Sequence, residues 1–324
     1  MNRLIHLCSA LFLLLTPGFL FANTKDLPLV AISQMVAHPA LDATYRGVVD
    51  ELLARGYEEG KNIRLMYETA QGDISIAGQI ARKFAGEKPA LIIAIATPAA
   101  QTVATAARGI PIVFAAVTDP VEAKLVSNYE KPGKNITGVS DEVAFAQHLE
   151  MIHEIVPAAK RIGTVYNPGE ANSVATLKKM EAFMADKPEL QLVSAAATKT
   201  SEVLGAARSL VGKADVLYIT LDNTVVSALE AVIQVGEQNK LPVFNADTDS
   251  VFRGSIAAVG FDYYDVGRLS GEYAARILGG EKPGDIPVGR PDRLRLVINP
   301  EAAKRMGVKI PPEVTAKAAD RAGK

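Results

Sequence analysis

The sequence predicts an α/β protein with two Rossmann-like lobes, each a parallel sheet covered by helices. Short apolar runs alternate with amphipathic helical patterns, and this alternation occurs in two series separated by a turn at 131–135. The chain has 324 residues and is 48% hydrophobic, which suits two cores of ordinary size. The two halves share this architecture without an obvious sequence repeat.

The first series lies before the turn. Its apolar runs predict four strands: LPLVAIS (27–33), NIRLMYE (62–68), ALIIAIA (90–96) and IPIVFAAV (110–117). Between these strands, the apolar spacing predicts helices over 41–55, 74–86 and 98–108. Strands that are apolar along nearly their whole length are typical of parallel sheets buried on both faces.

The second series begins after the turn, with a short strand, ITGVS (136–140). Further strands are predicted at RIGTVYN (161–167), LQLVSAAA (190–197), DVLYIT (215–220) and LPVFNA (241–246). Helices are predicted near 142–156, 171–185, 201–211 and 224–239. Beyond residue 246 come a strand at 254–262, a helix at 263–280, a strand near 293–298 and a final helix from Pro300.

The first 22 residues have the pattern of a cleavable secretory signal peptide. Arg3 gives a positive start, Leu4 to Leu15 form a short apolar run, and a small residue, Ala22, precedes a polar continuation. The run is too short and too broken to favour a membrane anchor. Cys8, the only cysteine, precedes most of that run, so no lipoprotein cysteine is indicated, and the chain after residue 22 needs no disulfide.

Composition and motifs weigh against several function classes. A formal net charge of −1 argues against a nucleic-acid surface. The sequence lacks dinucleotide-binding, P-loop, GxSxG and HExxH motifs and any cysteine cluster. His148 and His153 are five residues apart, which is poor spacing for a shared metal. We therefore predict no enzyme activity, no metal and no cofactor.

Polar residues gather where the apolar strands end. The carboxyl ends of parallel strands share one edge of a sheet, and this edge is where open α/β folds bind ligands. The predicted site residues are Gln34, His38, Thr97, Pro98, Ala99, Thr118, Asp119, Tyr166, Asn167, Asp222, Asn223, Asn245 and Asp247.

Each of these residues also has a structural interpretation. Thr97 and Thr224 are suitable helix N-caps, Asp119-Pro120 is a common turn opener, and His38 could orient the loop before the first helix. Asp222 and Asp247 fit a purely structural role least well, because each follows a buried strand and neither has a lysine or arginine beside it.

Three segments carry a family resemblance: ISQMVAHPALDATYRG (32–47), IPIVFAAVTDPVEAKLVSNYEKPGKNITGVS (110–140) and LRLVINPEAAKRMG (294–307). The chain resembles the periplasmic substrate-binding proteins of ABC transporters in the tryptophan/tyrosine-binding family, which have the type I periplasmic binding protein fold. The resemblance spans nearly the whole chain after residue 22.

The resemblance implies how the chain divides. The N-terminal lobe would comprise 23–120 plus 256–284, and the C-terminal lobe 136–250 plus 290–324. Three hinge crossings are expected near 119–140, 247–255 and 282–293. This arrangement places the strand at 254–262 in the N-terminal lobe, and it implies lobes that open and close around a ligand.

The resemblance and the site residues together predict a periplasmic solute-binding protein of an ABC importer. An aspartate can pair with a ligand ammonium, and helix-opening amides with hydroxyls such as those of Thr97 and Thr118 can bind a carboxylate. These groups suit an amino acid, and the resemblance favours an aromatic one. The expected partners are this small ligand and an inner-membrane ABC permease, with the protein acting as a monomer. A protein that feeds a membrane sensor and an exported enzyme on the same fold remain as alternatives.

Overall fold

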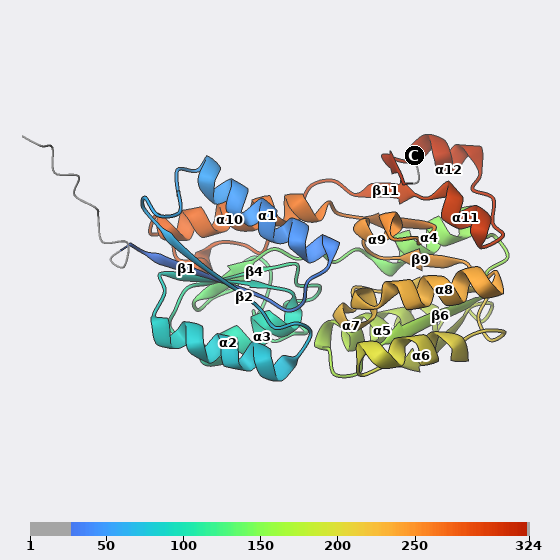
Figure 1. The fold of residues 1–324 in the computed structure, drawn as a ribbon, viewed down its shortest axis with the longest axis horizontal. Coiled ribbons are helices and arrows are strands. Elements are labelled where there is room, and N and C mark those ends of the chain that lie inside the picture. Colours follow the sequence, from blue (N-terminus) through green and yellow to red (C-terminus); the bar gives the residue numbers. More distant parts are fainter. Residues whose placement is uncertain (1–26, 323–324) are drawn as a thin grey trace, which may run out of the picture.

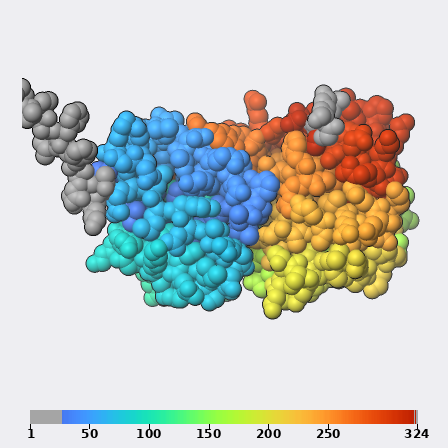
Figure 2. Space-filling view, in the orientation of Figure 1, coloured from blue at the N-terminus to red at the C-terminus, as the bar shows by residue number. Residues whose placement is uncertain are grey.

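The computed structural model describes residues 27–322, and the predicted signal peptide (1–22) lies outside them. Two α/β lobes lie side by side along the long axis of the molecule (Figures 1 and 2). Each lobe is built on its own sheet and its own large cluster of buried apolar residues. The two-lobed α/β fold predicted from the sequence is confirmed.

The sheet of the N-terminal lobe is entirely parallel, with the strand order β2-β1-β3-β4-β5. Its strands are β1 (Leu29–Gln34), β2 (Arg64–Thr69), β3 (Leu91–Ile95), β4 (Ile112–Ala115) and β5 (Ile136–Gly138). β1, β3 and β4 are buried along their whole length, as their unbroken apolar sequences predict.

Helices cover both faces of this sheet (Figure 1). They are α1 (Pro39–Ala54), α2 (Ile74–Glu87), α3 (Thr97–Ala106) and α10 (Tyr263–Leu278). α1 and α10 are far apart in sequence but lie side by side, and glycines allow their backbones to meet. A Cβ atom on Gly47 would lie 2.2 Å from the carbonyl oxygen of Tyr264, and one on Gly267 would lie 2.1 Å from that of Thr44. A side chain at either glycine would therefore force the two helices apart.

The sheet of the C-terminal lobe has the strand order β12-β11-β10-β9-β8-β6-β7 within the described residues. Its strands are β6 (Arg161–Tyr166), β7 (Gln191–Ala196), β8 (Val216–Ile219), β9 (Val243–Asn245), β10 (Ala257–Gly260), β11 (Arg295–Ile298) and β12 (Asp320–Arg321). β11 runs antiparallel to β10, and β12 pairs with β11 in parallel. The rest of the sheet is parallel, as predicted.

The helices of this lobe are mostly short. They are α4 (Phe145–Ile155), α5 (Ala171–Met184), α6 (Val203–Ser209), α7 (Asn223–Ser227), α8 (Leu229–Asn239), α9 (Asp249–Phe252), α11 (Pro300–Arg305) and α12 (Pro312–Lys317), with 3₁₀ turns at Thr200–Glu202 and Pro283–Asp285. The helix predicted over 224–239 is broken at Ala228, which separates α7 from α8.

The predicted place of the strand at 254–262 is wrong. This segment forms β10, which pairs with β9 and β11 in the C-terminal sheet rather than with any strand of the N-terminal lobe. The amide of Ile256 donates to the carbonyl of Val243, so the chain needs only the short helix α9 to return beside the strand it has just left. The helix α10, and not the strand before it, crosses to the N-terminal lobe.

The chain therefore crosses between the lobes at places that differ in part from those expected. The first crossing lies between Val139, in the N-terminal core, and Phe145, in the C-terminal core. The second falls between β10 and Phe261 rather than at 247–255. The third lies between Gly289, which bridges to Val139, and β11. This crossing overlaps the expected one at 282–293. The expected start of the C-terminal lobe at residue 136 is also wrong, because β5 pairs with β4 in the N-terminal sheet. Three crossings join the lobes; the first begins at the end of the expected 119–140, and the second is displaced.

Candidate ligand-binding site between the lobes

The carboxyl ends of strands from both lobes border a narrow cavity of about 20 Å³. The N-terminal lobe contributes His38, Thr97 and Thr118, and the C-terminal lobe contributes Asp222 and its neighbours. A space of this size holds about one water molecule, so the lobes lie close together here. An amino acid could enter only if the lobes separated.

The N-terminal face of this cavity presents polar atoms without partners among the described residues. Thr97 is the first residue of α3, it is 2% exposed, and its Oγ1 has no hydrogen-bond partner. Nδ1 of His38, the N-cap residue of α1, also has none. Burial, and then the positive charge of Arg253, lower the pKa of His38 to about 3, so this imidazole is neutral at neutral pH. Both side chains retain hydrogen-bonding capacity that a ligand could use.

Two alanines shape this face through unusual backbone conformations. Ala96 (φ 78°, ψ 154°) directly follows β3, and Ala116 (φ 53°) directly follows β4; both line the cavity. Such positive φ values favour glycine and cost non-glycine residues of order 1–3 kcal/mol. Ala96 is also the N-cap residue of α3 and provides no side-chain cap, so the interpretation of Thr97 as the cap is wrong. Thr97 instead occupies the first helical turn, with its hydroxyl free.

The C-terminal face is an organised acidic network. Asp222 is fully buried and caps α7 through Oδ1, which accepts from the amide of Val225 at 2.9 Å. Its Oδ2 accepts from the amide of Asn167 at 2.6 Å and from Oγ of Ser173 at 2.5 Å. Burial, and then the negative charge of Glu170, raise the pKa of Asp222 to about 7. Asp222, not Thr224, is therefore the N-cap of this helix.

Glu170 is a central member of this network that the sequence analysis missed. It is 4% exposed and accepts from the backbone amides of both Asn223 and Thr224, from Nδ2 of Asn223 at 2.6 Å and from Oγ1 of Thr224. The residue sits in a loop after β6 rather than directly at its end, so strand-end reasoning had no reason to select it. It fixes the start of α7 and thereby positions Asn223 on the cavity wall.

Asp247 follows β9 and lines the same cavity. It is 2% exposed, and its two carboxylate oxygens accept from the amide of Ser250 at 2.8 Å and from Oγ of Ser250 at 2.6 Å. Burial raises the pKa of Asp247, and no lysine or arginine forms a described ion pair with it. Each oxygen retains a lone pair, so the carboxylate could still bind a ligand ammonium.

The first crossing supplies a further carboxylate that the sequence did not single out. Asp141 is 5% exposed, lines the cavity, and accepts a hydrogen bond at Oδ2 from the hydroxyl of Tyr263 at 2.9 Å. Burial raises the pKa of Asp141 to about 6. Asp141 lies in the first crossing and Tyr263 begins α10 just after the second, so this bond ties the first crossing to the chain that follows the second.

The charges around the cavity share one sign. Asp141, Asp222 and Asp247 all line it, and burial raises the pKa of each. Among the described residues that line it, none is a lysine or arginine. Buried carboxylates are costly without a cationic partner. The cleft therefore favours a ligand that carries a positive group.

Several predicted site residues do not reach this cavity. The described lining of the cavity does not include Gln34, Pro98, Ala99, Asp119, Tyr166, Asn167 or Asn245. Nε2 of Gln34 donates to Val36 and Asp42, and Asn167 is bound to Asp222, Thr224 and Gly169.

Asp119 has a different role from the one predicted. Its Oδ1 accepts from the amides of Val121 and Glu122, so it opens a turn, as its structural interpretation suggested. Its Oδ2 forms an ion pair with Lys179 of α5, and Lys179 also pairs with Glu142. Asp119 therefore links the two lobes at the rim of the cleft.

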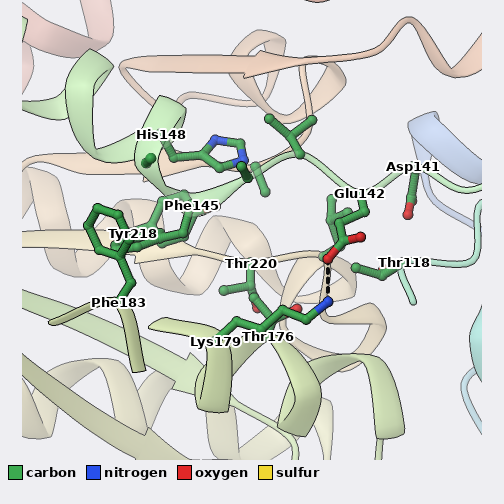
Figure 3. Close-up of a pocket in the computed structure, with 15 residues that line it drawn as sticks. Thr118, Asp141, Glu142, Phe145, His148, Thr176, Lys179, Phe183, Tyr218 and Thr220 are labelled. Atoms are coloured by element: carbon green, nitrogen blue, oxygen red, sulfur yellow. Dashed lines mark hydrogen bonds and ion pairs between the residues drawn. The ribbon is translucent and has the colours of Figure 1, made fainter. Parts of the chain in front are cut away.

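A second, larger cavity of about 330 Å³ adjoins the first and shares Thr118, Asp141 and Leu221 with it. The first crossing, α4, α5 and the end of β8 surround it (Figure 3). Lys179 and Glu142 lie at its rim, and the aromatic rings of Phe145, Phe183 and Tyr218 lie on its other side. The sequence analysis identified no side-chain pocket, because these residues come from separate elements and most resemble core.

Within residues 27–322, no group of three or more histidine, cysteine, aspartate or glutamate side chains is placed to hold a metal ion. Over the same range, no helix is both long enough and apolar enough to cross a membrane.

Comparison with known proteins identifies the family. The family model for ABC transporter substrate-binding proteins matches residues 29–322. The chain belongs to this family. It is 40% identical over 284 residues to a tyrosine-binding protein of Clostridioides difficile, covering 88% of this chain and 82% of that one.

Solved structures extend the similarity. A conserved domain protein from Vibrio cholerae is 50% identical, with a TM-score of 0.88 and coverage of 91% of this chain and 99% of that one. The ABC domain from Streptococcus pneumonia in complex with L-Trp is 32% identical, with a TM-score of 0.87 and the same coverage. The ligand-free, open structure of a substrate-binding protein with adhesive properties from Clostridium difficile is 38% identical, with a TM-score of 0.69 and coverage of 92% and 100%.

The last two structures differ in a way that sequence does not explain. The open structure is closer to this chain in sequence than the L-Trp complex is, yet it superposes less well. This structure thus superposes better overall on the ligand complex than on the open structure, and its own two lobes lie close together. This agrees with the small volume of the cavity between them.

Proposed function

We propose that this protein is the periplasmic solute-binding component of an ABC importer and that it binds an α-amino acid between its lobes. The observation that carries the proposal is the set of buried carboxylates around the cavity, Asp141, Asp222 and Asp247, without a lysine or arginine in the described lining. A ligand ammonium would supply the missing positive charge. The relatives that bind tyrosine and tryptophan favour an aromatic amino acid.

The opposite face would receive the ligand carboxylate. Thr97 offers a free, buried hydroxyl at the start of α3, where the helix dipole also favours negative charge. Thr118, at the end of β4, lies on the same cavity wall. We assign the ammonium to Asp247, with Asp222 as the second choice and Asp141 as a contributor from the hinge. Because these groups come from both lobes, the ligand would hold the lobes together.

The remaining parts of the proposal follow from the family. Export would be directed by residues 1–22, the protein would act as a monomer, and the closed, loaded form would dock on an inner-membrane permease. Rotation at the three crossings would open the cleft for ligand entry, since the present cavity is too small for an amino acid.

A thermal-shift screen tests the proposal directly. A ligand that binds only the folded state stabilises it by about 2.7 kcal/mol at a concentration 100 times its dissociation constant. We expect tyrosine or tryptophan to raise the melting temperature, whereas the matching amine without its carboxylate and the matching acid without its amine should have little effect. If no amino acid shifts the transition while nucleobases or sugars do, the assignment is wrong.

A further inference from the structure

The larger cavity beside the cleft has the features of a binding compartment. Its volume of about 330 Å³ is far larger than that of the narrow cavity, and the two are neighbours that share the lining residues Thr118, Asp141 and Leu221. In an aromatic amino acid, a single methylene group joins the ring to the α-carbon. A ring whose head group lies in the cleft must therefore occupy space directly next to it.

Aromatic side chains form one end of this compartment. The rings of Phe145 and Phe183 meet edge to face, with centroids 5.5 Å apart and an interplanar angle of 87°. Tyr218 lies 5.5 Å from Phe145, measured between the ring centroids, and 5.2 Å from His148. Aromatic pairs favour such tilted and edge-to-face arrangements, so these walls could accept a further ring. All four residues line the cavity (Figure 3).

Two buried polar atoms in the same walls have no partner among the described residues. Nδ1 of His148, in α4, and Oγ1 of Thr220, after β8, lack hydrogen bonds, although each residue is only 3% exposed. Burial lowers the pKa of His148 to about 4, so at neutral pH the ring is uncharged and has one donor and one acceptor nitrogen. Buried polar atoms of this kind normally have a partner.

We propose that this compartment receives the aromatic ring of the ligand, and that His148 determines specificity by binding a ring-borne N–H or O–H group. This inference rests on the proposed function, since it assumes that the amino-acid head group lies in the cleft. Thr220 is placed to assist from the strand opposite. The ligands selected would be tyrosine and tryptophan, whose rings carry such a donor, over phenylalanine, whose ring does not.

Entry of the ligand requires a change in the ion pairs of Lys179. Lys179 lies at the rim, paired with Asp119 of the N-terminal lobe and with Glu142 of the first crossing. Opening of the lobes would break the pair with Asp119 and widen the entrance to both cavities together. The head group and the ring would then enter in one movement, and closure would restore the pair over the ring.

Calorimetric titration of the full chain with tyrosine, tryptophan and phenylalanine tests the role of His148. The wild-type protein should prefer the better of tyrosine and tryptophan over phenylalanine by about tenfold or more, because a ligand without the donor leaves His148 unpaired. His148→Phe should remove most of that preference by weakening the donor-bearing ligand. His148→Gln, which retains hydrogen-bonding groups, should keep part of it.

The control is His153→Phe, the same substitution on the same helix. His153 contacts the carbonyl oxygen of Ala159 and lines neither cavity, so its replacement should leave the preference unchanged. If the wild-type protein binds no aromatic amino acid, the proposed function fails. If it binds them and the folded His148 variants keep the wild-type preference, only the role of His148 fails.

Fluorescence locates the ring independently of any variant, because the chain contains no tryptophan. A bound tryptophan ligand is then the only indole present. Its emission should shift to shorter wavelength on binding and resist quenching by acrylamide, as expected for a ring enclosed by Phe145, Phe183 and Tyr218. Emission and quenching unchanged from those of free tryptophan, at a concentration where calorimetry shows binding, would place the ring in solvent and overturn the proposal.

Discussion

The two faces of the cleft differ in how far their polar groups are already satisfied. On the C-terminal face, Asp222 and Glu170 are saturated by neighbouring amides and hydroxyls. On the N-terminal face, Oγ1 of Thr97 and Nδ1 of His38 have no partner in the described structure. Hydrogen bonds within the protein thus fix the side chains of Asp222 and Glu170. The unpaired atoms of Thr97 and His38 remain able to bind a ligand. Substitution of Asp222 should therefore affect mainly stability, and substitution of Thr97 mainly affinity. Asp247, also on the C-terminal face, accepts bonds from Ser250 and should affect both.

The largest expected effect is on stability, from the C-terminal face. Asp222→Ala removes the cap of α7, which typically contributes about 1 kcal/mol, and it leaves the buried hydroxyl of Ser173 and the amide of Asn167 without their acceptor. We expect a loss of about 3 kcal/mol in the free energy of unfolding, measured by urea denaturation without ligand. A loss below about 1 kcal/mol would mean that this network does not hold the face together.

Asp247 should affect affinity most. Truncating one partner of a buried charge pair typically costs about 2–5 kcal/mol, so Asp247→Ala should weaken amino-acid binding by roughly 30-fold or more. Some stability should also be lost, because Asp247 accepts two bonds from Ser250 and is more buried than a loop position suggests. Calorimetry measures the affinity, and the exposed Asp186→Ala in the same lobe is the matched control. Wild-type affinity in both Asp247→Ala and Asp222→Ala would exclude ammonium recognition at these positions.

The hinge carboxylate should make binding depend on pH. Burial raises the folded-state pKa of Asp141 to about 6, so acid protonates it and removes a charge that attracts the ligand ammonium. Affinity should fall by up to about tenfold per pH unit below pH 6. The stability of the ligand-free protein should change in the opposite direction as the pH falls. Its folded state binds this proton more tightly than its unfolded state, so the contribution of Asp141 to stability improves as pH falls from about 6 towards 4. Asp141→Asn should reduce the pH dependence of both profiles between pH 7 and 5, and Asp222, whose pKa is raised to about 7, should account for part of what remains. Unchanged profiles would refute this role of Asp141.

Thr97 offers the clearest contrast with Asp222. Thr97→Ala should weaken binding about fivefold, the equivalent of one neutral hydrogen bond of about 1 kcal/mol. It should leave the free energy of unfolding nearly unchanged, because Oγ1 of Thr97 has no partner to lose among the described residues and does not cap α3. Calorimetry and urea denaturation on the same sample compare the two effects. A drop in stability without a drop in affinity would reverse the assignment of the N-terminal face.

The fold was largely predictable because apolar strands and amphipathic helices are local patterns. The place of β10 was not, since its sequence fits a buried strand in either sheet and only pairing with β9 and β11 decides between them. At the site, strand ends correctly located Thr97, Thr118, Asp222 and Asp247 on one cavity.

Other site residues had no such local signal. Asp141 lies in a crossing segment, and the apolar pattern around His148 is that of an ordinary packed helix. Asp119 and Asn167 do follow strands, but their side chains form hydrogen bonds with other groups of the protein. Three-dimensional packing alone distinguishes such residues from those that face the cleft, because the sequence gives no information on side-chain direction within a loop.

The smallest expected effect concerns the backbone of the N-terminal face. Ala96 has a φ of 78° and a ψ of 154°, a region that is almost exclusive to glycine and costs other residues of order 1–3 kcal/mol. Ala96→Gly relieves this strain but also gives the unfolded chain more freedom, which offsets about 0.4–1 kcal/mol of the gain. We expect a net gain of about 1 kcal/mol in the free energy of unfolding. Ala100→Gly, four residues later in the helical part of α3, should instead destabilise by about 1 kcal/mol or more. If both substitutions destabilise equally, Ala96 is not strained. If only Ala96→Gly stabilises, the N-terminal face carries strain that holds the Thr97 hydroxyl at the cleft.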